Sequence, residues 1–569
     1  MARLRIALAQ VDLTVGAIER NAETVRLWTA RAVEAGADVL AFPEMTLTGY
    51  PPEDLVYRRS FLDANLTALQ ALASESGDLP VVVGYLDDDG GRRNAAAVLQ
   101  RGEVRARYFK HFLPNYGVFD EERYFEPGVR LPLVRIAGVD VAVLICEDLW
   151  QAGGPVAAAG AAGAGLAIVI NGSPYEQGKS DYRLELVARR AREAACPFAY
   201  VNTVGGQDEL VFDGDSMVVG ADGRLLARAP RFTELLLVHD VDIEPPAVPG
   251  EASAAGTELV VERVDLTTGA RKVNERADGG ICEPLAGEAE VWGAIVTATR
   301  DYVRKNGFAS VVLGLSGGID SAVVATVAVD ALGAPAVHTV GLPSAYSSPG
   351  SRDDAAELAR RQGTPHCVIE IQPAVDAYAA MLAASGGLTG LAAENLQARV
   401  RGTTLMALSN EHGHLVLTTG NKSELATGFS TLYGDSAGGF APIKDVPKTL
   451  VWRLAEWRNA EARSRNETEP IPTQIISKPP SAELAPGQLD ADRLPAYDVL
   501  DAVLDDYVER DLGRDALIAR GHDTDLVKLV IGLVDAAEYK RRQYPPGPKI
   551  TPKNFGRDRR LPITNRFAD

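Results

Sequence analysis

The sequence predicts two successive α/β domains, because strand-like and helical patterns alternate in two long stretches of the chain. In residues 1–245, short apolar runs that end in turn residues alternate with segments of helical apolar spacing. The alternation returns after residue 286, whereas residues 246–285 interrupt it and begin with a stretch rich in Pro, Ala and Gly. Such alternation is typical of stacked α/β layers. We therefore predict domains at 1–245 and 286–569, joined by a connection at 246–285.

The bulk composition fits a large folded protein and disfavours nucleic-acid binding. The 569 residues include 58 Lys and Arg against 77 Asp and Glu, so the net charge is −19. A surface this acidic repels phosphate backbones, although a local basic or amide-lined pocket can still bind a small phosphorylated ligand. The four cysteines are widely spaced and form no C-x-x-C pair, so we expect neither disulfides nor a zinc site.

The amino-terminal segment, MARLRIALAQVDLTVG, has the alternation of a strand and lacks the apolar core of a signal peptide. No run of 18 or more apolar residues indicates a membrane span. We therefore predict a cytoplasmic protein without a membrane partner.

Three reactive side chains each follow a strand-like run in the first domain. Glu44 follows VLAFP, Lys110 follows ARYF, and Cys146 follows VAVLI. Loops at strand ends converge to form sites in α/β layers. A thiol attacks as its thiolate, so Glu44 can accept the thiol proton and pass it to a leaving amine, while Lys110 can stabilise an anion. This set suffices for attack on an amide or nitrile. A lone cysteine after a strand is more often a small buried apolar residue, as we expect for Cys196.

The segments FPE, KHFLPNYGVF and ICED together resemble the nitrilase superfamily over about the first 245 residues. The resemblance implies a four-layer α-β-β-α sandwich, with Glu44 as proton acceptor, Lys110 as oxyanion stabiliser and Cys146 as nucleophile. A second glutamate near the site would be Glu121 or Glu122, and the family pattern does not choose between them. For a glutamine substrate, the implied contacts are Tyr116, Glu147, Ser173 and Lys179.

A glycine-rich turn between a strand-like run and a helix marks the second domain. In VVLGLSGGIDSAVVATVAVDALG, Gly317 and Gly318 allow the backbone to approach a phosphate, and the following helix presents free N–H groups to it. Asp320 supplies a carboxylate of the kind that Mg²⁺ prefers. The spacing and the lysine of a Walker A loop are absent.

SGGIDS resembles the PP-loop of ATP pyrophosphatases, which implies a doubly wound parallel sheet with flanking helices. The strings TTGNKSELATGF, AENLQARVRG and EYKRRQYPPGPK narrow the resemblance to NAD synthetases. It implies ATP and deamido-NAD as substrates, with Mg²⁺ held by Asp320 and Glu424. The implied ATP contacts are Gly314, Leu315, Ser316, Gly317, Gly318, Ile319, Asp320, Ser321, Thr419 and Lys448. The implied deamido-NAD contacts are Asn395, Arg399, Glu424, Asp435 and Lys540.

Three further features belong to this second resemblance. Leu432 stands where synthetases that use free ammonia often carry Lys, so a neighbouring residue or the backbone would contact the substrate instead. Residues 478–498 are interpreted as a mobile flap over the active site, with Ser481 near ATP. We interpret Arg541 and Arg542 as part of a basic run that is exposed to solvent and has no role in the site.

The two resemblances together imply glutamine-dependent synthesis of NAD. An amidase would release ammonia from glutamine through a thioester, and a ligase would adenylate deamido-NAD and let ammonia displace AMP. A shielded passage would keep the ammonia unprotonated and nucleophilic. Two alternatives are an amidotransferase that makes another amide and a nucleotide-binding sensor with inactive relics of both sites. The strings TTGNKSE and KRRQYPPGPK argue against the first, and the complete reactive sets argue against the second. We also expect a homo-oligomer.

Overall fold

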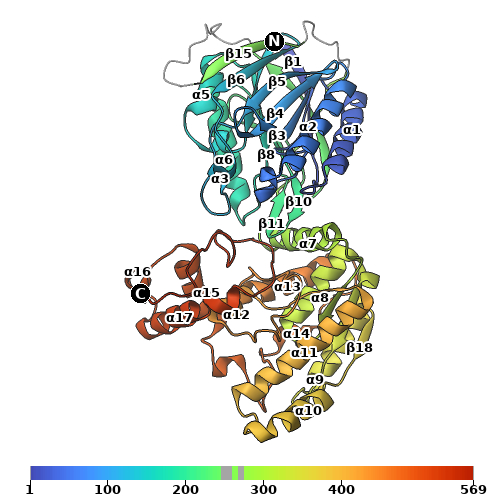
Figure 1. The fold of residues 1–569 in the computed structure, drawn as a ribbon, viewed down its shortest axis with the longest axis vertical. Coiled ribbons are helices and arrows are strands. Elements are labelled where there is room, and N and C mark those ends of the chain that lie inside the picture. The colour runs from blue at the N-terminus through green and yellow to red at the C-terminus, as the bar shows by residue number, and fades with distance from the viewer. Residues whose placement is uncertain (1, 245–258, 267–274, 568–569) are drawn as a thin grey trace. The chain divides into compact units, whose positions relative to one another are not determined.

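The computed structural model of the chain describes residues 2–244, 259–266 and 275–567 (Figure 1). Strands and helices alternate in both halves, as the sequence predicts. Across these three ranges, no helix is both long enough and apolar enough to cross a membrane.

Two compact units divide the chain, each with its own sheet structure. Unit 1 comprises residues 1–207 and 212–285, and unit 2 comprises residues 208–211 and 286–569. Residues 208–211 lie at the turn of a hairpin formed by β10 (Val204–Gln207) and β11 (Leu210–Asp213).

Unit 1 contains two sheets that share a buried core. Alternate residues of its first strand separate into two apolar clusters: Ile6 and Leu8 pack with the second sheet, whereas Ala7 and Ala9 pack with outer helices. This follows from the opposite directions of successive side chains in a strand. The first sheet has the order β14 (Leu235–Ile243), β1 (Ala2–Gln10), β2 (Val39–Ala41), β3 (Val81–Asp88), β4 (Arg92–Gln100), β5 (Glu103–Phe109). The second has the order β13 (Leu225–Arg228), β12 (Met217–Val219), β9 (Phe198–Asn202), β8 (Leu166–Asn171), β7 (Val139–Ile145), β6 (Arg130–Ile136), β15 (Val260–Asp265).

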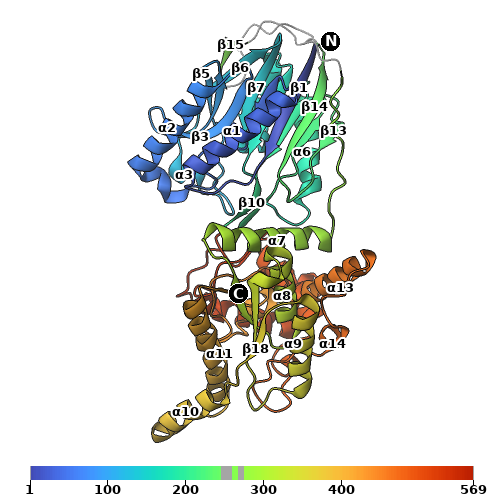
Figure 2. The same cartoon turned by 90° about the vertical axis from the view of Figure 1, so that its right-hand side faces the viewer.

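Helices cover the outer face of each sheet and complete four layers (Figures 1 and 2). On the first sheet, α1 (Ile18–Glu34) and α2 (Arg59–Glu75) bury apolar residues such as Trp28. On the second, α5 (Gly154–Ala161) and α6 (Lys179–Ala194) do the same. The four-layer α-β-β-α sandwich is therefore confirmed.

The segment interpreted as a connection, 246–285, contributes one strand to unit 1. β15 pairs in parallel with β6 along its whole length, from Val260 to Asp265. Residues 246–258 and 267–274 of this segment lie outside the described residues.

Unit 2 is built on a parallel sheet of the order β18 (His366–Val368), β17 (Val337–Gly341), β16 (Val311–Gly314), β19 (Leu415–Val416). β16 comes first in the sequence and lies between β17 and β19, so the chain extends the sheet to one side and then to the other. This reversal is the switch point of a doubly wound sheet, where ligands bind beyond the carboxyl ends of the strands. The predicted fold class is confirmed.

Helices flank this sheet (Figure 2). The helix α8 (Ile319–Leu332) is apolar almost throughout and packs against β16, β17, α7 (Glu288–Lys305) and α13 (Lys448–Ser464). The longer helices are α7 (Glu288–Lys305), α8 (Ile319–Leu332), α9 (Pro349–Gln362), α10 (Gln372–Leu382), α11 (Leu391–His412), α13 (Lys448–Ser464) and α17 (Thr524–Ala536). The shorter ones are α12 (Lys422–Thr427), α14 (Thr473–Ser477), α15 (Tyr497–Leu504), α16 (Arg514–Ala519) and α18 (Glu538–Arg541).

Candidate active sites

Cys146 lies at the end of β7, where the chain turns sharply into the short helix α4 (Glu147–Trp150). Its backbone has φ 43° and ψ −93°, a combination that residues with a side chain rarely adopt and that costs roughly 1–3 kcal/mol. Its N–H donates to the carbonyl oxygen of Ile170 in β8 at 3.0 Å, which anchors the turn to the neighbouring strand. Backbone strain of this kind clusters at functional sites, which supports a special role for this thiol.

Lys110 joins two buried glutamates. Its Nζ donates to Oε1 of Glu44 at 2.7 Å and to the carboxylate of Glu121 at 2.9 Å, and all three side chains are almost fully buried. Glu121 is the first residue of α3 (Glu121–Tyr124), whereas Glu122 is exposed. Of the two glutamates that the sequence left open, the geometry therefore favours Glu121.

Three further groups hold these carboxylates, and sequence reasoning singled out none of them for that task. Asn94 in β4 donates through Nδ2 to Glu44 at 2.7 Å, and the backbone N–H of Gly172 donates to the other oxygen of Glu44 at 2.8 Å. The hydroxyl of Tyr50 donates to Glu121 at 2.9 Å. Asn94 lies in a strand-like run and Tyr50 in a turn-rich segment, so neither carried a local signal of chemistry.

Burial and mutual charge shift the pKa values of this centre. Burial alone would lower the pKa of Lys110, but the carboxylates of Glu121 and Glu44 outweigh it and raise that pKa well above its usual value. Burial raises the pKa of Glu121 to about 7, with Lys110 opposing the shift. Burial, and then the Glu44 carboxylate, raise the pKa of the Cys146 thiol, while Lys110 opposes. The resting thiol is therefore protonated and needs a base as it attacks, a role that Glu44 can fill.

Two of the predicted glutamine contacts meet beside the nucleophile. Glu147 directly follows Cys146, and its Oε2 accepts a hydrogen bond from the hydroxyl of Tyr116 at 2.9 Å. Its other oxygen accepts from Gln151 at 2.7 Å. The Tyr116 ring is 54% exposed, so this pair offers a polar surface that a substrate amine can reach.

The other two predicted glutamine contacts lie at the ends of one loop. Ser173 follows β8 and is buried, and Lys179 is the first residue of α6. The Nζ of Lys179 donates to the carbonyl oxygen of Pro174 at 3.1 Å and lies 5.4 Å from the ring centre of Trp150. Burial, and then the charge of Arg183, lower the pKa of Lys179 to about 8.

The glycine-rich turn of unit 2 is folded tightly between β16 and α8. Gly317 has φ 77°, and a Cβ there would lie 2.2 Å from the carbonyl oxygen of Ser351, so only glycine fits. The Ser316 hydroxyl accepts the N–H of Gly318 at 3.2 Å and lies 3.1 Å from the hydroxyl of Ser321. These bonds hold the turn at the amino-terminal end of α8, where free N–H groups favour phosphate.

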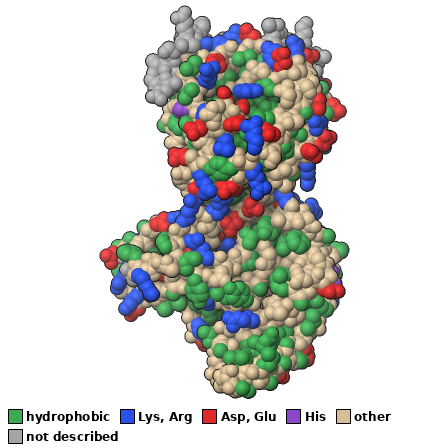
Figure 3. Space-filling model, viewed as in Figure 1, with side chains coloured by type: hydrophobic (Ala, Val, Ile, Leu, Met, Phe, Trp, Pro, Cys, Tyr) green, Lys and Arg blue, Asp and Glu red, His purple; other side chains and the backbone are tan. Residues whose placement is uncertain are grey.

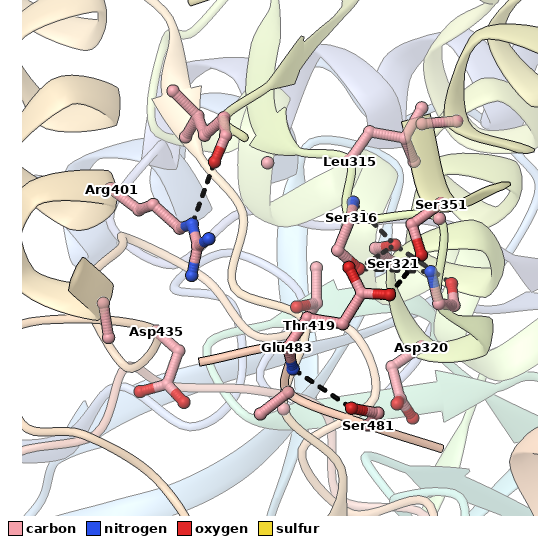
Figure 4. A pocket seen from close by; sticks show the side chains of 18 of the residues that line it. Leu315, Ser316, Asp320, Ser321, Ser351, Arg401, Thr419, Asp435, Ser481 and Glu483 are labelled. Carbon is pink, nitrogen blue, oxygen red and sulfur yellow. Dashed lines mark hydrogen bonds between the residues drawn. The ribbon is translucent and has the colours of Figure 1, made fainter. Parts of the chain in front are cut away.

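A cavity opens above this turn at the carboxyl ends of the strands (Figure 4). All of the predicted ATP contacts line it: Gly314, Leu315, Ser316, Gly317, Gly318, Ile319, Asp320, Ser321, Thr419 and Lys448. Glu424, Asp435 and Ser481 line it as well. Arg401 was not predicted; it enters the cavity from α11 and donates to the carbonyl oxygen of Leu342 at 3.0 Å.

Lys448 bridges the two predicted metal ligands. Its Nζ donates to Asp320 at 2.5 Å and to Glu424 at 3.4 Å, and Asn421 donates to the other oxygen of Asp320 at 3.0 Å. Burial raises the pKa of Glu424 to about 8, with Lys448 opposing the shift and Asp320 adding to it. Among the described residues, no group of three or more His, Cys, Asp or Glu is arranged to hold a metal ion by itself.

The predicted deamido-NAD contacts gather around residues 428–435. The Lys540 Nζ donates to the carbonyl oxygens of Gly428 and Ser430, at 2.7 and 2.8 Å. Asn395 accepts from the Thr431 hydroxyl, Arg399 donates to the carbonyl oxygen of Leu432, and Asp435 accepts the Thr431 N–H. Of the predicted set, Glu424 and Asp435 line the cavity, whereas Asn395, Arg399 and Lys540 are not among its lining residues. Residues 428–435 contact the three predicted residues that do not line the cavity, and they include Asp435, which does.

The segment interpreted as a flap contributes one wall of the cavity. Lys478, Ser481 and Glu483 all line it. Glu483 accepts hydrogen bonds from the hydroxyls of Ser348 and Ser351, at 2.9 and 2.6 Å, and from the Ser348 N–H at 3.2 Å. The carboxylate thus binds the amino-terminal end of α9 close to the glycine-rich turn (Figure 4).

One unit places a thiol, a lysine and a glutamate on a four-layer sandwich, and the other places a glycine-rich turn at the switch point of a doubly wound sheet. The class of protein is a carbon–nitrogen hydrolase joined to an ATP-dependent ligase. Residues 5–245 match the family model described as carbon-nitrogen hydrolase, and residues 291–544 match the model described as NAD synthase.

Full-length relatives specify the family. The chain is 44% identical to the glutamine-dependent NAD(+) synthetase of Thermotoga maritima, covering 100% of both chains, and 45% identical to that of Xanthomonas campestris, covering 99% and 98%. A solved glutamine-dependent NAD+ synthetase from Acinetobacter baumannii, in complex with ADP, is 41% identical with a TM-score of 0.74, covering 99% of each chain. One from Cytophaga hutchinsonii shares the fold at 22% identity with a TM-score of 0.80, covering 99% and 98%. The chain belongs to the family of glutamine-dependent NAD(+) synthetases.

Proposed function

We propose that the chain converts deamido-NAD, ATP, glutamine and water into NAD, AMP, pyrophosphate and glutamate. The observation that carries this proposal is the presence, on one chain, of a buried Cys–Lys–Glu centre and a glycine-rich phosphate-binding turn. An amidase that releases ammonia and a ligase that consumes it form one reaction sequence. Full-length likeness to glutamine-dependent NAD(+) synthetases supports the choice of substrates.

At the amidase site, Cys146 attacks the side-chain carbonyl of glutamine. Glu44 accepts the thiol proton as the C–S bond forms and delivers it to the amide nitrogen, which leaves as ammonia. Lys110, held by Glu44 and Glu121, stabilises the oxyanion of the tetrahedral intermediate. Water then attacks the thioester, which releases glutamate and restores the thiol.

Four side chains hold the glutamine during these steps. Lys179 binds its α-carboxylate, and the pair of Tyr116 and Glu147 binds its α-amine. Ser173, at the other end of the Lys179 loop, completes the pocket. The partly exposed Tyr116 and the half-buried ammonium of Lys179 support these roles.

At the ligase site, the turn from Ser316 to Ser321 holds the β- and γ-phosphates of ATP. The nicotinate carboxylate of deamido-NAD attacks the α-phosphate, pyrophosphate leaves, and an adenylate forms. Ammonia attacks the activated carbonyl and AMP departs. Thr419 and Lys448 bind ATP, and Asn395, Arg399, Glu424, Asp435 and Lys540 bind deamido-NAD. Ammonia must reach the adenylate unprotonated, because ammonium has no lone pair for attack.

Mg²⁺ fits the ligase site. This cation usually takes one or two carboxylates together with substrate phosphates and water, and Asp320 and Glu424 are two carboxylates already bridged by one cationic group, Lys448. We infer that both would hold the metal, which when bound neutralises charge on the pyrophosphate. Lys448 adds a second positive charge beside the phosphates.

We infer that the chain forms a homo-oligomer through unit 2. The helix α10 has no buried residue, and exposed apolar side chains lie on and around it: Val368, Tyr378, Met381 and Leu391. Figure 3 shows apolar side chains gathered at the α10 end of unit 2, and an exposed apolar patch is typical of an interface. Sedimentation velocity tests this, since replacing Met381 and Leu391 with Asp should yield monomers.

The cytoplasmic location stays a prediction from the sequence.

One assay tests the function as a whole. The purified chain is mixed with deamido-NAD, ATP and Mg²⁺, and NAD is measured with glutamine, with ammonium salt, or with neither. We expect NAD in the first two mixtures only, with one AMP for each NAD. The proposal would be contradicted if the chain cleaved ATP to AMP with another nicotinate nucleotide but not with deamido-NAD.

A further inference from the structure

The carboxylate of Asp148 connects the two chain segments that carry Lys110 and Cys146. Asp148 is the second residue of α4 and has no exposed surface. Its Oδ1 accepts the backbone N–H groups of His111 and Phe112, at 3.1 and 3.0 Å. These two residues directly follow Lys110, so Oδ1 fixes the path of the chain where it leaves the lysine.

The other carboxylate oxygen holds the opposite segment. Oδ2 of Asp148 accepts the backbone N–H of Ile145 at 3.0 Å and the hydroxyl of Tyr108 at 2.6 Å. Ile145 directly precedes Cys146, so this bond closes a loop around the strained backbone of the nucleophile. Tyr108 lies two residues before Lys110 in β5. Four donors thus satisfy one buried carboxylate, and three of them are backbone groups next to the reacting side chains.

We propose that Asp148 is a positioning residue for glutamine hydrolysis, setting the place of the Lys110 ammonium relative to the Cys146 thiol. The inference rests on the amidase function proposed above. A carboxylate suits this task because it only accepts hydrogen bonds, and every group that faces it is a donor. Asparagine has only one acceptor oxygen. If that oxygen keeps the bonds to the His111 and Phe112 N–H groups, the amide N–H₂ faces the Ile145 N–H, which is then left without an acceptor. Displacement of reacting groups by about 1 Å can cost on the order of 100-fold in rate.

The test uses Asp148→Asn in the full chain, with glutamate release and ammonia-dependent NAD synthesis measured separately. We expect kcat for glutamine hydrolysis to fall about 10–100-fold, because alignment of the nucleophile and the oxyanion site is lost. KM for glutamine should stay within about threefold, since the four hydrogen bonds of the Asp148 carboxylate involve none of the side chains assigned to glutamine binding. Ammonia-dependent synthesis should stay unchanged, because its residues belong to unit 2. A purely structural role would not produce this split.

Matched variants sharpen the comparison. Tyr108→Phe removes one of four donors and should reduce kcat less than Asp148→Asn does. Asp63→Asn, at an exposed position of α2, should change neither activity. Asp148→Glu keeps the charge but moves the carboxylate by one methylene, and it should show the same loss of kcat; it also serves if the asparagine variant does not fold.

Three outcomes would overturn the proposal. The first is a folded Asp148→Asn enzyme with the kcat of the wild type. The second is failure of both Asp148 variants to fold, or parallel loss of both activities, which would make Asp148 a structural residue only. The third is a wild-type chain that releases no glutamate from glutamine, which would overturn the amidase function as well.

Discussion

The ammonium group of Lys448 lies 2.5 Å from Oδ2 of Asp320 and 3.4 Å from Oε1 of Glu424, so one cation binds two carboxylates in the cavity above the glycine-rich turn. Burial raises the pKa of Glu424 to about 8 even though Lys448 opposes that shift. Without a metal ion, Glu424 therefore holds a proton at neutral pH. Mg²⁺ that arrives with ATP would replace that proton, so a substitution of Asp320 tests the ligase site directly.

Asp320→Asn should reduce NAD synthesis at least about 100-fold with either glutamine or ammonium as nitrogen source. The substitution removes a charge that the bound metal and Lys448 both require, and charge neutralisation on the pyrophosphate drives the adenylation step. Formation of AMP and pyrophosphate is measured directly. Asp330→Asn is the matched control, because Asp330 lies on the same helix but binds Trp292 and Arg458 instead. Near-normal turnover by Asp320→Asn would contradict the metal assignment.

Cys146→Ala should abolish NAD synthesis from glutamine, by at least about 1000-fold, and leave synthesis from ammonium salt within about twofold. The nucleophile is lost, but the ligase site receives its ammonia from solution. Cys196→Ala serves as control, since Cys196 is buried in the apolar core of unit 1 and should retain both activities. If a folded Cys146→Ala protein lost both activities, the two chemistries would not be separable.

Glutamate release should decline as the pH falls through about 7. Burial raises the pKa of Glu121 to about 7, so the carboxyl is ionised above this pH and neutral below it. Protonation removes one of the two negative acceptors that hold Lys110, and because Glu44 and Glu121 interact, the apparent pKa belongs to the cluster. Glu121→Gln should be slowed about 10–100-fold at all pH values and lose this inflection. A pH profile that Glu121→Gln leaves unaltered would speak against the role of Glu121.

The parts of both sites that follow a strand in sequence could be predicted, because a strand end followed by a reactive residue is a local signal. Glu44, Lys110, Cys146 and the turn from Ser316 to Ser321 are of this kind. The residues that hold them could not be predicted. Asp148 stood inside the ICED string with no visible distant partner, since three of its four donors come from a segment 36–40 residues earlier.

Other features depend on tertiary packing alone. Arg541 belongs to a basic run with the pattern of a solvated surface, yet it is buried and donates to the carbonyl oxygens of Ala426 and Val534. The strand Val260–Asp265 has one neighbour, β6, so its pairing depends on a strand more than 100 residues earlier. Local pattern therefore predicted the two folds, whereas the contacts that shape each site required the structure.

KM for glutamine should rise above about pH 8, by up to tenfold for each further pH unit. Burial and Arg183 lower the pKa of Lys179 to about 8, so its ammonium is charged below this pH and is lost above it. A neutral amine binds the α-carboxylate of glutamine poorly. Lys179→Arg should keep KM flat to higher pH, because a guanidinium stays protonated, and Lys179→Met should raise KM at every pH. An unchanged KM in Lys179→Met would exclude this contact.

Glu483→Ala should raise KM for ATP about tenfold in the ammonia-dependent reaction while kcat changes little. Glu483 binds the hydroxyls of Ser348 and Ser351 and the Ser348 N–H, which fastens the segment 478–498 over the glycine-rich turn. Hydrogen bonds to a charged group contribute about 1.5–3 kcal/mol each, partly offset by water in the open state, and tenfold corresponds to about 1.4 kcal/mol.

The control for this prediction is Glu467→Ala, at an exposed position outside the cavity. Ser348→Ala removes a partner of the same carboxylate and should raise KM in the same direction by a smaller factor. The double variant tests whether the two residues act together: if they do, its KM should equal that of Glu483→Ala alone, because the bond is already lost. Additive effects in the double variant, or an unchanged KM in Glu483→Ala, would show that this carboxylate does not hold the segment closed.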